Sequence, residues 1–74
     1  MKNLFYFNDH DQMSLSRLYN IREEARLNCQ TSEDRKKFIR FYESDESFFY
    51  GSEKELERYC QDYDLDKENF YKII

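Results

Sequence analysis

The chain has 74 residues and a formal net charge of −4, and 19% of its residues are aromatic: seven Phe and seven Tyr, with no Trp. A chain this short buries only about 60% of its unfolded surface, so we expect a single domain, residues 1–74. Its aromatic content argues against disorder, because disordered segments are poor in aromatic residues. No apolar run approaches the ~18 residues of a membrane-spanning helix. We therefore expect no membrane partner and a cytoplasmic location.

No catalytic or metal-binding signature is recognisable in the sequence. Cys29 and Cys60 lack a Cys-x-x-Cys partner and a histidine at ligand spacing, so we expect two reduced core thiols, with one disulfide as the alternative. The single histidine, His10, is flanked by Asp9 and Asp11, and a catalytic or metal-binding role would need a nucleophile or further ligands from elsewhere in the fold, which nothing in the sequence identifies. Gly51 is the only glycine, which excludes a glycine-rich phosphate loop. We therefore expect no enzymatic activity, no cofactor and no metal.

One acidic segment has the spacing that begins a calcium-binding loop, with Asp62, Asp64 and Asp66 at alternate positions. Such a loop needs glycine at its sixth position and glutamate at its twelfth. This chain has Lys67 and Ile73 at those positions. We interpret the segment as a solvated acidic turn in which Asp66 caps a helix.

In chain order, residues 2–7 are predicted to form a strand, since the run is aromatic and too short for a helix. Apolar residues then recur at intervals of three and four, which predicts a helix that begins after Ser14 and ends before Gln30. Ser14 is its expected N-cap, with Met13 and Leu18 as a hydrophobic staple. The predicted buried face consists of Leu15, Leu18, Ile21, Ala25 and Cys29.

Two aromatic runs in the middle of the chain are predicted to be strands. They cover residues 38–42 and 47–50, and residues 43–46 would form a short hairpin loop between them. Short apolar runs do not distinguish strand from helix. A helix over residues 32–42 capped by Ser32 is therefore kept as the alternative.

The clearest helix start in the chain follows Gly51. Ser52 and Glu55 have the spacing of a capping box, in which the serine hydroxyl and the glutamate carboxylate each bind a free backbone N–H. Apolar residues then follow at helical spacing on one side of the predicted helix. These residues are Leu56, Tyr59, Cys60 and Tyr63.

The C-terminal segment is predicted to be a last short helix capped by Asp66, with Leu65 and Phe70 as its staple. Ile73 and Ile74 would dock its end. The expected fold is therefore α+β: a small antiparallel sheet of about three strands with two to three helices, in the order β-α-β-β-α-α. With helices on one face of this sheet, its second aromatic face would remain uncovered and would be a candidate surface for a homodimer or for another partner.

Charge is distributed unevenly along the chain. Residues 1–40 contain eight Lys/Arg and six Asp/Glu, whereas residues 41–74 contain four and ten. An acidic surface attracts positively charged partners, so we expect a protein partner with a basic surface, such as a nucleic-acid enzyme. The same carboxylates would also simply keep a small aromatic domain in solution. The candidate partner-binding residues are Glu43, Asp45, Glu46, Glu53, Glu57, Asp62, Tyr63 and Asp64.

A short basic segment supports an alternative function. Lys and Arg residues beside two phenylalanines are typical of nucleic-acid surfaces, and here they would serve a small transcriptional regulator. The sequence pI near 4.9 opposes binding to a polyanion, so direct nucleic-acid binding is not our leading hypothesis. The candidate residues for this alternative are Arg35, Lys36, Lys37 and Arg40.

In overall composition the chain resembles the small acidic proteins that bacteriophages and mobile elements encode against host defences. It shares their short length, scarce glycine and abundance of Asp, Glu, Tyr and Phe. These proteins include anti-CRISPR and anti-restriction inhibitors, some of which mimic the negative surface of DNA. The resemblance implies a non-catalytic inhibitor and assigns no role to any particular residue. A structural homodimer without inhibitory function is a further alternative.

Overall fold

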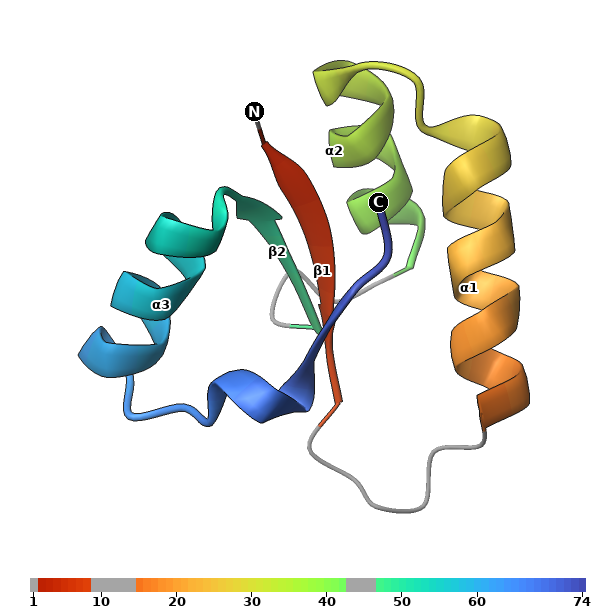
Figure 1. The fold of residues 1–74 in the computed structure, drawn as a ribbon. Helices are drawn as coiled ribbons and strands as arrows, with labels where there is room; N and C mark the ends of the chain where they lie inside the picture. The colour runs from red at the N-terminus through yellow and green to blue at the C-terminus, as the bar shows by residue number, and fades with distance from the viewer. Residues whose placement is uncertain (1, 9–14, 43–46) are drawn as a thin grey trace.

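The computed structural model describes residues 2–8, 15–42 and 47–74. The described residues include strands, α-helices and a 3₁₀ turn, whose arrangement Figure 1 shows. The strands form one antiparallel sheet in the order β2-β1-β3, which confirms the predicted α+β class and small antiparallel sheet. In chain order the elements are β1 (Asn3–Phe7), α1 (Leu15–Asn28), α2 (Ser32–Phe41), β2 (Phe48–Gly51), α3 (Glu53–Asp62), η2 (Lys67–Asn69) and β3 (Phe70–Lys72).

The central strand, β1, is apolar on both faces. Successive side chains of a strand point to opposite faces of the sheet, so Leu4 and Tyr6 lie on one face and Phe5 lies on the other. All three side chains are buried. This arrangement explains why β1 is a continuous apolar run and does not alternate with polar residues.

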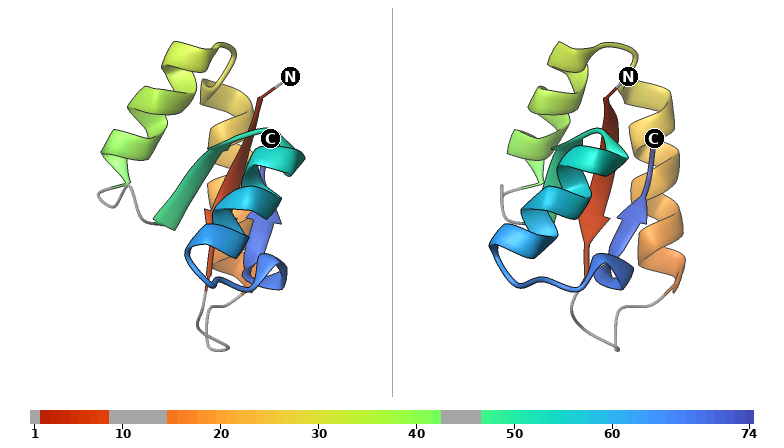
Figure 2. Two further views of the ribbon diagram at one scale, coloured as in Figure 1. Left: turned by 90° about the vertical axis from the view of Figure 1, so that its left-hand side faces the viewer. Right: turned by 60° about the vertical axis from the view of Figure 1, so that its left-hand side comes forward.

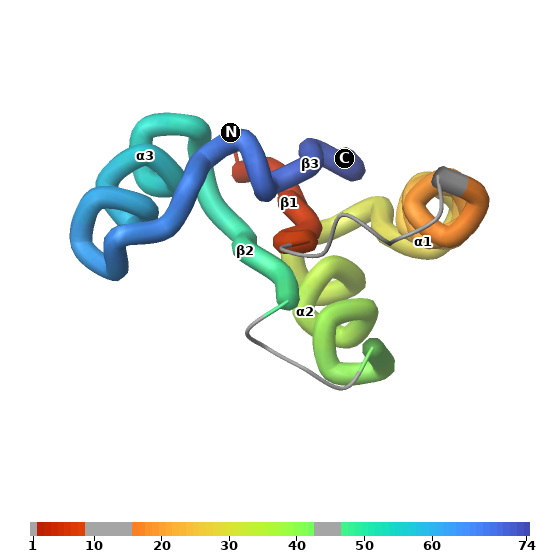
Figure 3. Tube along the Cα trace, turned by 90° about the horizontal axis from the view of Figure 1, so that it is seen from below, coloured from red at the N-terminus to blue at the C-terminus, as the bar shows by residue number. Residues whose placement is uncertain are grey.

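Helices cover both faces of the sheet. Figures 2 and 3 show α1 and α2 on one side and α3 on the other. The cluster on the α1–α2 side consists of Leu4, Tyr6, Ile21, Ala25, Cys29, Phe38, Phe48 and Ile73. The cluster on the α3 side consists of Phe5, Leu56 and Cys60, with Phe49, Leu65 and Phe70 against it. The prediction of an uncovered aromatic face was therefore wrong for the part of the chain that the structure describes, and it no longer supports a homodimer.

The predicted strand over residues 38–42 was also wrong, because this segment belongs to the end of α2. The structure instead has the alternative that we retained, a helix that begins at Ser32. Its N-cap is Thr31, whereas we expected Ser32. The oxygen Oγ1 of Thr31 accepts a hydrogen bond from the backbone N–H of Asp34, and the Asp34 carboxylate accepts one from the N–H of Thr31. This reciprocal cap decides between two conformations that the aromatic run by itself permits. The expected hairpin loop, residues 43–46, lies outside the described residues.

The C-terminal segment forms a strand where we predicted a helix. Asp66 does act as a cap, since its carboxylate accepts a hydrogen bond of 3.0 Å from the N–H of Glu68, but the helix is a single 3₁₀ turn. Residues 70–72 then pair with β1 as β3. This pairing gives hydrogen-bond partners to backbone groups along an edge of β1 that would otherwise lack them. Ile73, which we expected to dock the end of this segment, is buried.

The two remaining predicted helices are present. In α1, Ile21 and Ala25 are buried and face the sheet, whereas the expected cap and staple at residues 13–14 lie outside the described residues. In α3, Ser52 is the N-cap and its Oγ accepts a hydrogen bond from the N–H of Glu55 at 3.2 Å. The Glu55 carboxylate does not complete the predicted box and lies 3.6 Å from Nζ of Lys2.

Candidate functional site

The sheet separates the charges of the chain into two sides. Residues 15–42, which include α1 and α2, contain seven Lys/Arg and four Asp/Glu, a formal charge of +3. Residues 52–69, which include α3 and η2, contain three Lys/Arg and seven Asp/Glu, a formal charge of −4. These segments lie on opposite faces of the sheet (Figure 3). Among the described residues, the uneven charge along the sequence thus becomes a difference in charge between these two segments on opposite faces of the sheet.

Two of the predicted partner-binding residues meet in a hollow on the α3 side. Glu57 and Asp64 line this hollow of about 380 Å³. Glu57 accepts a hydrogen bond of 2.7 Å from Nζ of Lys67, which also lines the hollow. This hydrogen bond lowers the pKa of Glu57 and raises the pKa of Lys67. The negative charge of Glu57 is therefore partly compensated, while Asp64 stays exposed beside it.

Tyr63 is an exposed aromatic side chain at the end of α3, with 66% of its surface accessible. Its ring centroid lies 4.7 Å from that of Tyr59, which in turn lies 5.1 Å from that of Phe49. This row of rings connects the exposed tyrosine to the core. Asp62 and Asp64 flank Tyr63 in the chain and are exposed, and Asp64 has a φ of 53°, a conformation that Asp adopts more readily than most residues.

The predicted acidic residues of α3 do not form one continuous row. Glu53 and Glu57 are four residues apart and share one flank of the helix, whereas Asp62 belongs to another flank. The helical positions between these flanks carry the exposed side chains of Lys54 and Arg58. Three further predicted residues, Glu43, Asp45 and Glu46, lie outside the described residues.

The four basic residues of the alternative site all lie on α2, but the helix directs them to different sides. Lys36 and Arg40, four residues apart, share one face of the helix, are exposed, and line a shallow hollow together with Ile39 and Phe48. Lys37 is exposed on the side that faces α1. Arg35 is half-buried, and its Nε has no hydrogen-bond partner among the described residues. The helix therefore does not present the four as a single row.

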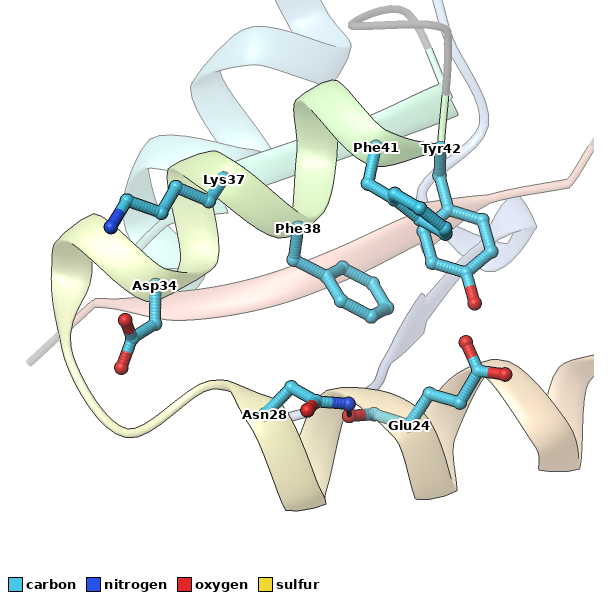
Figure 4. Close-up of a pocket in the computed structure, with 7 residues that line it drawn as sticks. All are labelled: Glu24, Asn28, Asp34, Lys37, Phe38, Phe41 and Tyr42. Atoms are coloured by element: carbon cyan, nitrogen blue, oxygen red, sulfur yellow. Dashed lines mark hydrogen bonds between the residues drawn. The ribbon is translucent and has the colours of Figure 1, made fainter.

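Sequence reasoning missed a groove between α1 and α2. It has a volume of about 510 Å³, and Figure 4 shows the side chains that surround it. Phe41 is 79% exposed at its rim, although a fully exposed Phe forgoes roughly 1.5–3 kcal/mol of burial free energy. As a strand, residues 38–42 would not have placed their rings together. The lining residues are Glu24, Asn28, Asp34, Lys37, Phe38, Phe41 and Tyr42.

The rings of this groove continue into the core. The ring centroid of Phe41 lies 5.2 Å from that of Tyr42, and that of Tyr42 lies 4.6 Å from that of Phe38. Phe38 is buried and packs edge-on against Phe48 of β2 at 5.9 Å. The signal for this cluster was present in the helical alternative, which puts residues 38, 41 and 42 on neighbouring positions of one helix face.

The described ranges show no group of three or more His, Cys, Asp and Glu side chains that could hold a metal ion. Within the same ranges, no helix has both the length and the apolar character needed to cross a membrane.

The resemblance to acidic anti-defence proteins concerns composition and points to no residue of either surface. Membership of that class of inhibitor therefore remains a prediction from composition. A comparison of the chain with protein-family models, with curated proteins and with solved structures finds no match.

Proposed function

We propose that this protein is a non-catalytic binding module that docks the side formed by α3 and η2 on a positively charged surface of a partner protein. The observation that supports this proposal is the division of charge across the sheet among the described residues, −4 in residues 52–69, which include α3 and η2, against +3 in residues 15–42, which include α1 and α2. A charged patch steers and orients an approaching partner of opposite charge. A basic partner is therefore drawn to one side of the molecule and repelled by the other.

Tyr63 is the proposed anchor of this surface. Tyrosine is enriched among the residues that dominate binding free energy, because its ring buries a large area while its hydroxyl can form hydrogen bonds. Tyr63 is exposed and supported from behind by Tyr59, so its ring is held without having to be ordered on binding. Asp62 and Asp64 on either side would contact cationic groups of the partner.

Surfaces that bind nucleic acid are rich in Lys and Arg. Their positive charge is complementary to the negative charge of the α3–η2 side. The proposed partner is therefore a nucleic-acid enzyme, and the protein would act as an inhibitor in the cytoplasm of a bacterium or an infected cell. The compositional resemblance to anti-CRISPR and anti-restriction proteins agrees with this class of partner.

Affinity capture with matched variants tests the proposal. The tagged full chain is compared with D62N/Y63A/D64N, which alters the proposed anchor, and with K36Q/R40Q, which changes exposed charges on the opposite side. Bacterial lysate is applied at low and high salt, and the bound proteins are identified by mass spectrometry. We expect a basic nucleic-acid enzyme to bind the unchanged chain and K36Q/R40Q, to be lost from the anchor variant, and to be released by salt. Equal retention by all three chains would contradict the proposal.

The positive charge of the α1–α2 side favours a second candidate function, binding to nucleic acid through Lys36, Lys37 and Arg40 of α2. Phosphate contacts make such binding fall steeply with added salt. A gel-shift titration at low salt, with K36Q/R40Q as the comparison, tests this candidate. The absence of any shift at micromolar protein would remove it.

A further inference from the structure

The groove between α1 and α2 has two chemically different ends. At one end Phe41 and Tyr42 of α2 lie opposite Glu24 of α1. Toward the other end lie Asn28 of α1 and Asp34 of α2, and the side chain of Lys37 extends away from Asn28 (Figure 4). The buried ring of Phe38 lies between the two ends. The groove lies across the sheet from α3, so a ligand bound in it would be independent of the proposed function of the α3–η2 side.

The Glu24 carboxylate is available to a ligand. Its side chain is exposed, and the carboxylate makes no hydrogen bond or ion pair with any residue in the described ranges. In Figure 4 it points toward the hydroxyl of Tyr42 across the groove. The second carboxylate, Asp34, is already occupied, since it accepts hydrogen bonds from the N–H groups of Gln30 and Thr31.

Aromatic faces beside an available carboxylate favour a cation. The electron-rich face of an aromatic ring attracts a cation, and Arg does this more often than Lys. A neutral apolar occupant would remove water from Glu24 without replacing its hydrogen bonds, and an acidic occupant would be repelled by it. A guanidinium satisfies both features, because it stacks on a ring while it donates two parallel hydrogen bonds to a carboxylate.

Lys37 imposes a second requirement at the far end of the groove. It lies four residues before Phe41 on α2, which corresponds to a rise of about 6 Å along the helix. In an extended peptide, side chains two residues apart are separated by about 7 Å and lie on the same face. In Figure 4 the Lys37 side chain extends away from Phe41, but its stem is long and flexible, so its ammonium can turn back to meet an acidic side chain two positions from the arginine. Such an acidic residue would offset the positive charge of residues 15–42.

We propose that the α1–α2 groove binds an extended segment of a partner protein, with an arginine between Glu24 and the rings of Phe41 and Tyr42 and an acidic residue two positions away at Lys37. The volume of about 510 Å³ lies within the range of pockets, roughly 300–1,000 Å³, that enclose ligands. The exposed ring of Phe41 is then the part of the site that becomes buried on binding.

The test uses the blocked pentapeptide Ala-Arg-Ala-Glu-Ala, titrated into the ¹⁵N-labelled full chain and followed by NMR. We expect saturable shifts of backbone amides in α1 and α2. Replacement of the arginine by citrulline, its neutral isostere, or by lysine should weaken binding about fivefold or more. Equal affinity for the citrulline peptide, equal affinity for the lysine peptide, or no saturable shift at millimolar peptide would overturn the proposal.

Variants of the protein complete the test. E24Q keeps the size and shape of the side chain and removes its charge, and F41A removes the exposed ring; neither residue is buried, so both variants should fold. Both should weaken binding about fivefold or more. The matched control is L27A, because Leu27 is a similarly exposed apolar residue of α1 that does not line the groove. Unchanged binding by E24Q or F41A, or equal weakening by L27A, would contradict the site.

Discussion

Thr31 and Asp34 hold each other at the start of α2. The N–H of Asp34 donates a hydrogen bond to Oγ1 of Thr31, the N–H of Thr31 donates one to the Asp34 carboxylate, and each distance is 3.2 Å. The N–H of Gln30 donates a further hydrogen bond of 3.2 Å to the same carboxylate. This cap fixes the direction in which α2 leaves α1 and therefore supports the groove between the two helices.

The cap should make stability dependent on pH. Hydrogen bonds, first that from the backbone N–H of Gln30, hold the pKa of Asp34 below its ordinary value of 3.8. Because the folded pKa is the lower one, the stabilisation by Asp34 is present above about pH 3.8 and is lost as the pH falls through the folded value. D34N should lack this part of the acid dependence. Urea denaturation followed by circular dichroism over a pH series measures the difference.

Two further variants control this experiment. Glu57 also has a lowered pKa, caused by its hydrogen bond with Lys67, so E57Q shows how much acid dependence arises on α3. T31A should lower the free energy of unfolding by about 1 kcal/mol near neutral pH, while T31S, which keeps the hydroxyl, should change it little. Identical pH profiles for D34N and the unchanged chain would show that the cap does not govern acid stability.

Gly51 is predicted to tolerate no side chain, for steric reasons. A Cβ at this position would lie 2.6 Å from Oε2 of Glu55 and 2.8 Å from Cε1 of Phe49. The Glu55 carboxylate can rotate away, but the Phe49 ring packs against the buried cluster on the α3 side. We expect G51A to lower the free energy of unfolding by about 1–2 kcal/mol, measured in urea, even after the lower chain entropy of Ala is included. If the double variant G51A/E55A regained the full free energy of unfolding, the clash would be with Glu55 and not with Phe49.

The two cysteines should be slow to react in the folded protein and should not form an intramolecular disulfide. Cys29 is buried in the α1–α2 cluster and Cys60 in the α3 cluster, on opposite faces of the sheet. Burial raises the pKa of both thiols, so less of the reactive thiolate is present at a given pH. Both should react with a thiol reagent far more slowly in buffer than in urea, and C29S and C60S assign the two rates. A native rate equal to the unfolded rate for either thiol would refute this expectation.

The site could be predicted from the sequence only in part. The acidic character of the C-terminal half follows from composition, whereas helical spacing grouped Tyr63 with the apolar side of the helix. The structure leaves Tyr63 exposed at the end of α3, beside Asp62 and Asp64. The groove could not be found from composition and spacing, because it is lined by residues of two helices. Glu24 of α1 and Phe41 of α2, for example, are 17 positions apart in the chain and come together only when the helices pack. The rings of the groove also belong to a segment whose conformation the aromatic pattern leaves open.

Local interactions account for what the sequence determined by itself. The strand at residues 3–7, the buried positions of α1 and α3 and the caps at Ser52 and Asp66 all depend on residues close to each other in the sequence. Such interactions depend little on how the rest of the chain folds. For this reason they can be predicted from spacing and residue type.

Tertiary structure decided the elements whose local preferences were balanced. Residues 38–42 became helical because the Thr31–Asp34 cap and the contact of Phe38 with Phe48 favour a helix there. Residues 70–72 became a strand because β1, more than sixty residues earlier in the chain, offers backbone groups that need partners. The opposite charge of the two sides likewise arises only when the sheet places α3 across from α1 and α2. The strand at residues 70–72 and the opposite charges of the two segments depend on contacts between residues far apart in sequence, whereas the helix at residues 38–42 depends on the local Thr31–Asp34 cap together with the distant Phe38–Phe48 contact.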